Sequence, residues 1–295
     1  MISYILAYKR QLRKNVPVGR AGSAIDPAIK SPAARLFHHL FLRSPRERAT
    51  YCFTVKTLVR SQTHRTYFGA YLGVGLAFVV MGLVTLFTRH GFEAVFAVRS
   101  ELLSIPLVLG FFVLLGLRVV FSLPAYLPSN WIFRLTDGNN LSVCLSGVRK
   151  SMIALGLLPL LGLAFPFYLK VWGWQTAAVH TAYCATLSLI LIEVLLLRFD
   201  RIPFTCTYTP GSANLKLLWP VYLFGFTNYA YTMTELEQVL LRRPPLFILF
   251  FCASLVLLLA MSACRKRQIR RLSAFRYEAE SAPAPEILTL SYKPY

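Results

Sequence analysis

The sequence predicts an all-α membrane protein, a polytopic bundle of about six transmembrane helices with amphipathic helices on the cytoplasmic side. Hydrophobic residues make up 56% of the 295 residues and charged residues only 15%, whereas a soluble domain carries about 25% charged residues. Several apolar runs reach about 18 residues, the length that crosses a bilayer. The basic residues also gather on one side of these runs, as they do in membrane proteins.

Six apolar segments are the expected spans. They run over Tyr67–Thr88, Leu102–Leu123, Met152–Leu169, Ala177–Leu197, Leu215–Met233 and Leu246–Ala263. At about 1.5 Å per residue, a helix of this length crosses a hydrocarbon core of about 30 Å. The chain then divides into a basic N-terminal segment (1–66), a transmembrane domain (67–263) and a basic stop-transfer segment with a tail (264–295).

The distribution of basic residues predicts the orientation. Of the 32 Lys and Arg residues, 27 belong to the side of the two termini when Arg118, near that end of the second span, is counted with it. The other side carries Arg89, Arg99, Lys170, Arg242 and Arg243. Basic connections stay in the cytoplasm, so both ends of the chain are expected in the cytoplasm. The protein is expected in a cell membrane, the plasma membrane if the source is bacterial. Contact with anionic lipid accounts for the formal charge of +20, and no nucleic-acid-binding motif points to DNA or RNA.

A basic amphipathic helix that starts at Ser31-Pro32 is expected to lie on the membrane surface. Two further cytoplasmic helices are expected outside the spans. Ser44-Pro45-Arg46-Glu47 is a capping box that starts a helix running into the first span, with Cys52, Val55 and Val59 on its apolar face. The connection Pro124–Ser151 holds a second helix, which Asn140 caps.

Charged residues inside spans are the best pointers to function, because burying a charge in lipid is costly. Arg118 and Glu193 lie at similar depth in the second and fourth spans and are expected to pair. The alternative is that Arg118 extends to lipid headgroups while Glu193 reaches water.

No metal, cofactor or catalytic site is expected. His180 lies in the fourth span, and no other span contains a histidine to complete a haem or metal site. Glu235 and Glu237 are expected on a solvated outer loop. Catalytic signatures such as GxSxG, HExxH and the Walker loop are absent from the sequence. The chain is therefore expected not to be an enzyme, and a lipid-modifying activity is a weaker alternative.

Two further patterns concern helix contacts. Gly69, Gly73 and Ala77 form a ladder of small residues, which suits a dimer seam or close packing within one bundle. The fifth span has a polar outer half with Thr227, Asn228 and Tyr231. These side chains face a substrate or belong to an aromatic interface belt.

The overall plan resembles the membrane subunit of ABC-2-type exporters. The shared features are the basic amphipathic segment Pro45–Arg65, six spans with both ends inside, and the helical connection Asn140–Lys150. The resemblance implies a separate P-loop ATPase that docks on this connection. The docking residues would be Leu141, Leu145, Val148, Arg149 and Lys150.

The chain departs from that family in two connections. Thr234–Pro245 is short where the family commonly has re-entrant helices, and Arg198–Asn214 is long. The leading hypothesis is a transport permease powered by a separate ATPase and working as a homodimer or with a fused second half. The alternative is a non-catalytic scaffold or assembly protein that binds partners through the N-terminal segment and the Arg198–Asn214 loop.

Overall fold

The computed structural model describes residues 41–42, 44–91, 96–124, 141–197, 199, 203–204 and 215–271. Within these helices, the side chains of 141, 215–224, 227, 244 and 269–271 are not described. The chain divides into two units, Met1–Arg43 and Ser44–Tyr295, and the helices below all belong to the second.

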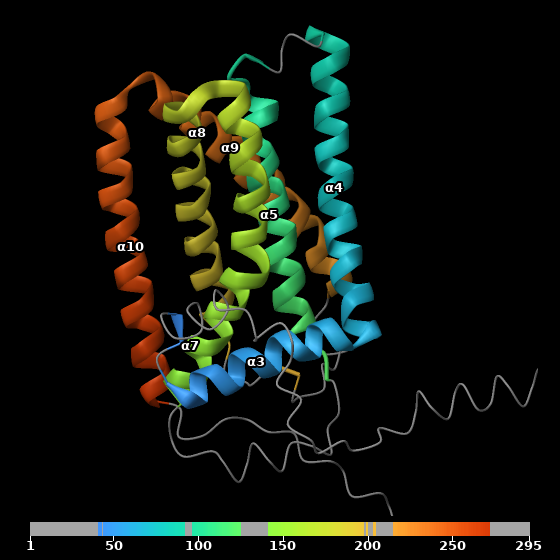
Figure 1. The fold of residues 1–295 in the computed structure, drawn as a ribbon, viewed down its shortest axis with the longest axis vertical. Helices are drawn as coiled ribbons and strands as arrows, with labels where there is room; N and C mark the ends of the chain where they lie inside the picture. Colours follow the sequence, from blue (N-terminus) through green and yellow to red (C-terminus); the bar gives the residue numbers. More distant parts are fainter. Residues whose placement is uncertain are drawn as a thin grey trace, which may run out of the picture. The chain divides into compact units, whose positions relative to one another are not determined.

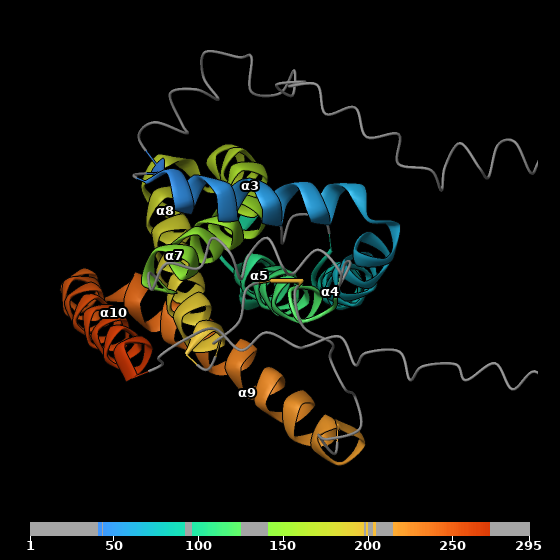
Figure 2. The same ribbon diagram turned by 90° about the horizontal axis from the view of Figure 1, so that it is seen from below.

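Every regular element in the described part of the second unit is a helix (Figure 1). In chain order the helices are α3 (Pro45–Arg60), α4 (Gln62–His90), α5 (Ser100–Val120), α7 (Leu141–Met152), the π-helix η4 (Ile153–Leu157), α8 (Leu158–Leu196), α9 (Leu215–Arg242) and α10 (Pro244–Arg271). Helix α3 lies across one end of the bundle, next to α7 (Figures 1 and 2). We call this the α3 end and the other the opposite end.

Four helical segments are long and apolar enough to cross a membrane. They are Gln62–His90, Ser100–Val120, Ser142–Leu196 and Pro245–Gln268. The third has 55 residues, far more than the roughly 20 that one crossing needs. Gly173 interrupts it with φ 77° and ψ 176°, and the chain turns back there at the opposite end (Figure 1). A positive φ of this kind is natural for glycine.

Helix α3 begins where the sequence predicts, whereas α4 begins at Gln62, five residues before the expected span. Ser44 caps α3 by accepting a hydrogen bond from the Glu47 N–H at 3.1 Å, and Pro45 occupies the first turn. Ser61 ends α3 in an extended conformation and also caps α4 through the His64 N–H. The surface helix therefore does not run straight into the long helix as expected, because the chain turns at Ser61.

The buried face of α3 differs from the expected one. Thr50, Thr54 and Leu58 are buried, whereas Val59 is 58% exposed. The threonines can be buried because each hydroxyl donates to a carbonyl four residues earlier in the same helix. The apolar pattern alone misplaced the face because it treats threonine as a polar surface residue.

Helix α5 is the central helix. Just over half of its apolar window (56%) is buried, against 11% for α4 and for α10. Pro106 has no N–H, so it leaves the Leu102 carbonyl without its helical partner. The Tyr168 hydroxyl of α8 donates to that carbonyl at 2.8 Å. This hydrogen bond gives the carbonyl a partner and holds α8 against α5.

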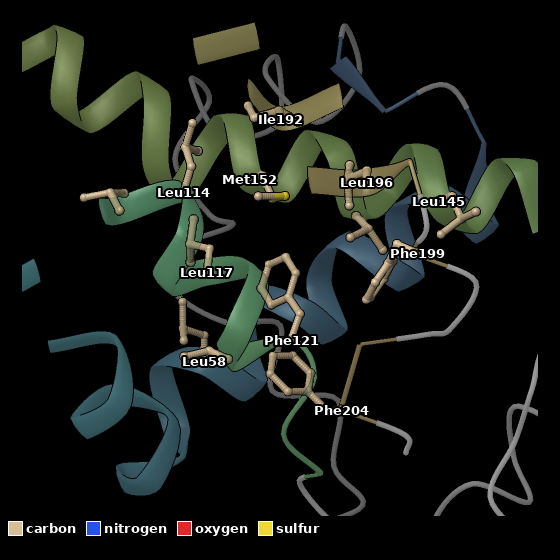
Figure 3. Packing of buried hydrophobic residues seen from close by; sticks show 13 residues of the cluster. Leu58, Leu114, Leu117, Phe121, Leu145, Met152, Ile192, Leu196, Phe199 and Phe204 are labelled. Carbon is tan, nitrogen blue, oxygen red and sulfur yellow. The ribbon is translucent and has the colours of Figure 1, made fainter. Parts of the chain in front are cut away.

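The largest core cluster lies at the α3 end (Figure 3). Leu58 of α3, Leu117 of α5 and Leu196 of α8 meet there with Phe121, Leu145 and Met152. Phe121 directly follows α5. A glycine in η4 permits the close approach, since a Cβ on Gly156 would lie 3.0 Å from a Leu114 methyl carbon. A smaller cluster around Leu107, Tyr183 and Leu240 joins α5, α8, α9 and α10 nearer the opposite end.

Candidate functional site

The returning half of α8, residues 174–196, carries a buried ionisable residue toward each end. His180 is 1% exposed and Glu193 is 0% exposed. Their spacing along one helix places them about 20 Å apart. Glu193 belongs to the α3 end and His180 to the opposite end, so one helix connects two polar sites.

At the α3 end, two arginines from different helices share the Glu193 carboxylate. Arg149 of α7 places Nε 2.7 Å from Oε1, and Arg265 of α10 places Nη1 3.2 Å from Oε2. Neither contact has the alignment of a hydrogen bond, so the attraction is mainly Coulombic. One negative charge thus holds α7, α8 and α10 together and leaves the site with net positive charge.

The expected ion pair between Arg118 and Glu193 is not formed. Arg118 donates from Nε to the Leu195 carbonyl at 3.0 Å and from Nη1 to the Ser122 hydroxyl at 2.6 Å. Its guanidinium also lies 4.5 Å from the Phe199 ring centroid. The prediction rested on equal depth, which does not say toward which neighbour each helix face points.

A second ionic contact joins α3 to α7. The Lys150 ammonium lies 2.8 Å from the Glu47 carboxylate, and the Ser146 hydroxyl donates to the same oxygen at 2.5 Å. Glu47 is 4% exposed. Gly147 lies beside it, with no room for a side chain, since a Cβ there would be 2.8 Å from the Glu47 carbonyl oxygen.

These contacts occupy the residues that were expected to dock an ATPase. Leu145 and Val148 are buried in the core, Arg149 binds Glu193 and Lys150 binds Glu47. The side chain of Leu141 lies outside the described residues. The four described side chains are therefore not free surface groups, because an amphipathic helix buries its apolar face in its own fold when one is available. Docking of an ATPase on this helix stays a prediction.

The Gly69, Gly73 and Ala77 ladder lies on the exposed face of α4. No described atom is within 4 Å of a Cβ added at Gly69 or Gly73. The close contact between α4 and α5 instead uses Gly75, opposite Phe112, and Gly116, opposite Tyr71. Packing inside the described bundle is thus not the role of the ladder, and a dimer seam there stays a prediction.

The polar residues of α9 also face outward where they are described. Asn228 is exposed and Tyr231 is 68% exposed, while the Thr227 side chain lies outside the described residues. They do not gather around a described site, so a substrate-facing role for them stays a prediction.

At the opposite end, His180, Cys184 and Glu237 form a closed cluster. The Glu237 carboxylate of α9 lies 2.5 Å from the His180 Nδ1, and the Cys184 sulfur lies 3.8 Å from both ring nitrogens. All three side chains are buried. Their nitrogen, sulfur and oxygen atoms lie within 4.8 Å of one another, close enough to hold one metal ion.

Aromatic side chains enclose this cluster. The Tyr168 ring packs edge-on against His180 with centroids 4.6 Å apart, and Trp172 stacks on Tyr168. The Tyr183 hydroxyl donates to the Met233 carbonyl at 2.8 Å, which ties α8 to α9 beside the cluster. Aromatic side chains thus surround the three ionisable groups.

Sequence reasoning missed this cluster for two identifiable reasons. The prediction considered only a second histidine as a partner ligand for His180. Cys184 lies four residues after His180 and shares its helix face. The prediction also placed Glu237 on a loop, because the apolar run stops near Met233. The helix continues to Arg242 and turns Glu237 inward, while Glu235 is exposed.

Neither a protein-family model, nor a curated protein, nor a solved structure matches this chain. Its apolar helices are compatible with a multi-pass membrane protein.

Proposed function

We propose that the chain is a six-span permease, with both ends in the cytoplasm, powered by a separate ATPase. The two halves of α8 would supply two crossings and α9 the sixth. The α3 end would then face the cytoplasm, in agreement with the 27 basic residues expected on that side. Basic α3 would lie along the lipid headgroups.

The observation that carries this proposal is the shared carboxylate of Glu193. A permease driven by an external motor needs a rigid connection between the surface that the motor touches and the helices that move. The surface helix α3 is held to α7 through Glu47 and Lys150, and α7 is held to α8 and α10 through Arg149, Glu193 and Arg265. Displacement of the surface helices would therefore be transmitted to two spans.

The contact surface for the ATPase must lie on the outward faces of α3 and α7, because their inner faces are occupied. Arg48 and Ala49 of α3 and Ser142 of α7 are exposed at this end. They are the natural sites for changes that weaken docking without disturbing the core.

The test is purification of the tagged full-length chain from its native membrane in mild detergent, followed by mass spectrometry. We expect a stoichiometric P-loop ATPase that is lost when Ala49 and Ser142 are changed to Glu. Arg89→Glu, an exposed change at the opposite end, should retain it. A homogeneous preparation without an ATPase would overturn the permease proposal.

The proposed topology has its own test. Reporter domains fused after Thr88 or Lys170 should report an outside location, and fusions after Leu123 or Leu197 an inside location. Inversion at any of these four positions would contradict the six-span arrangement.

A second candidate function is a membrane scaffold, and Phe204 favours it. This residue of the Arg198–Asn214 connection adopts φ 67°, a conformation that costs a bulky residue about 1–2 kcal/mol. Its ring is buried against Phe53, His64 and Phe121, and its N–H donates to the Phe121 carbonyl at 3.0 Å. An α3 end built to hold this connection in place would suit partner binding. Co-purification of another protein without an ATPase, abolished by replacing residues 205–213 with a Gly/Ser linker, would support the scaffold.

A further inference from the structure

We propose that His180, Cys184 and Glu237 bind a divalent transition-metal ion, with Zn²⁺ the best match to the ligand set. The site lies at the opposite end of the bundle from the Glu193 contacts. It does not depend on whether the chain is a permease or a scaffold.

The ligand set is chemically selective. An imidazole nitrogen, a thiolate sulfur and a carboxylate oxygen are the three protein ligands that zinc takes, whereas magnesium and calcium prefer oxygen alone. A buried His180–Glu237 pair would need no third group, but Cys184 places its sulfur 3.8 Å from either ring nitrogen. Ordinary core packing does not require three ligand atoms of these types to lie within 4.8 Å of one another.

The distances are close to those of a bound ion. Zinc takes nitrogen and oxygen at about 2.0–2.2 Å and sulfur at about 2.3 Å, so ligand atoms around one tetrahedral ion lie roughly 3.3–3.7 Å apart. The sulfur–nitrogen separation already approaches this value. The Glu237 oxygen, now 2.5 Å from His180 Nδ1, would have to withdraw by about 1 Å, which a carboxylate rotation can supply.

The carboxylate has unused bonding capacity. Glu237 Oε2 is buried and has no hydrogen-bond partner among the described residues. An unsatisfied buried carboxylate oxygen is costly. A cation between the three ligands would satisfy this charge and replace the hydrogen bond to His180.

The supporting residues favour a preformed site. His180 and Cys184 are one turn apart on the same helix, so their spacing is fixed before an ion arrives. Hydrogen bonds from Tyr168 to Leu102 and from Tyr183 to Met233 hold the helices on either side. With three protein ligands, the fourth position of a tetrahedral ion is left for water or an exchangeable ligand, as in zinc sites that act on a ligand instead of serving structure.

The experiment is a Co²⁺ titration of the metal-free full-length chain in detergent, with an affinity tag that contains no histidine. Cobalt replaces zinc in tetrahedral sites and gives a thiolate-to-metal charge-transfer band. We expect one equivalent to bind with this band present, and excess Zn²⁺ to remove it. Cys184→Ser should abolish the band, and His180→Gln and Glu237→Gln should each weaken Co²⁺ binding by more than about tenfold.

Matched controls come from exposed residues of the same types. Cys252→Ser, Cys264→Ser and His90→Gln change exposed groups and should leave band and stoichiometry unchanged. A band that survives Cys184→Ser, or no binding of Co²⁺ or Zn²⁺ to the folded wild-type chain, would overturn the proposal.

A second measurement does not depend on variants that fold. The X-ray absorption spectrum of the zinc-loaded wild-type chain should contain one sulfur neighbour together with nitrogen and oxygen neighbours. A first coordination shell of only nitrogen and oxygen would overturn the assignment.

Discussion

The two ends of the bundle use buried charge in opposite ways. At the α3 end, Glu193 faces two arginines, and all three groups come from different helices. At the opposite end, Glu237 faces one histidine, and the rings of Tyr168 and Trp172 pack against that histidine. Both clusters belong to the same half of α8, so the difference lies in the partners and not in the helix.

That difference has an energetic consequence. Arginine stays protonated in proteins, so the α3 end cannot discharge its cations if the carboxylate is removed. A histidine can instead keep a hydrogen bond when its partner is a neutral acceptor. The α3 end therefore depends on the charge of Glu193, whereas at the opposite end a neutral acceptor can replace the Glu237 carboxylate.

Replacing Glu193 with Gln should give the largest effect. Two partly buried guanidinium groups would lose the carboxylate that they share in the described part of the chain. Removing one partner of a buried ion pair costs about 3–5 kcal/mol. We expect a loss of this size in the free energy of unfolding, measured by SDS titration with far-UV circular dichroism.

The matched control is Glu235→Gln, which removes an exposed carboxylate. We expect it to change the unfolding free energy by less than about 0.5 kcal/mol. Equal effects of the two substitutions would mean that the Glu193 contacts do not hold the three helices together.

The local features of this end were predictable from sequence, but the contacts were not. Ser44, Pro45 and Glu47 mark the start of α3 because capping depends on residues three positions apart. The partners of Glu193 depend on how α7 and α10 rotate about their axes, and a single sequence carries no such information. Equal depth points to Arg118 as the partner of Glu193, whereas the amphipathic pattern of the connection assigns Arg149 to the surface.

At the opposite end, the sequence prediction missed the cluster for a different reason. The spacing of His180 and Cys184 is a local pattern that a search for mixed metal ligands would detect. Glu237 could not be added to them without knowing that α9 extends beyond its apolar run to Arg242. The long helices were therefore predictable from hydropathy, whereas the sites that connect them required the packing.

Close packing at the α3 end can be tested with Gly147→Ala. The new Cβ would lie 2.8 Å from the Glu47 carbonyl oxygen and 3.1 Å from the Thr50 Cβ. Because backbone must move to admit it, we expect a loss of about 2 kcal/mol in the same SDS titration. Gly162→Ala is the control, since its Cβ would have no described neighbour within 4 Å. A loss at Gly162 as large as at Gly147 would contradict a tight α3–α7 contact.

Glu237→Gln should cost less than Glu193→Gln in the metal-free chain. The amide oxygen can still accept a hydrogen bond from the His180 ring N–H, so the pair keeps its hydrogen bond and the expected loss is about 1–2 kcal/mol. A loss equal to that of Glu193→Gln would contradict the contrast between the two ends. The measurement must be made with chelator present, because a bound ion would stabilise the wild-type chain more than the variant.

The smallest expected effect concerns Phe204, which closes the α3 end from the connection after α8. Phe204→Ala and Phe204→Gly both remove the same buried ring, so their shared loss reports packing. Their difference reports the backbone, because glycine adopts φ 67° freely while alanine does not. We expect the glycine variant to be more stable than the alanine variant by about 1 kcal/mol in the SDS titration. At an ordinary negative φ the order would reverse, since glycine then loses more conformational entropy. A more stable alanine variant would therefore mean that the α3 end does not hold this residue in a left-handed conformation.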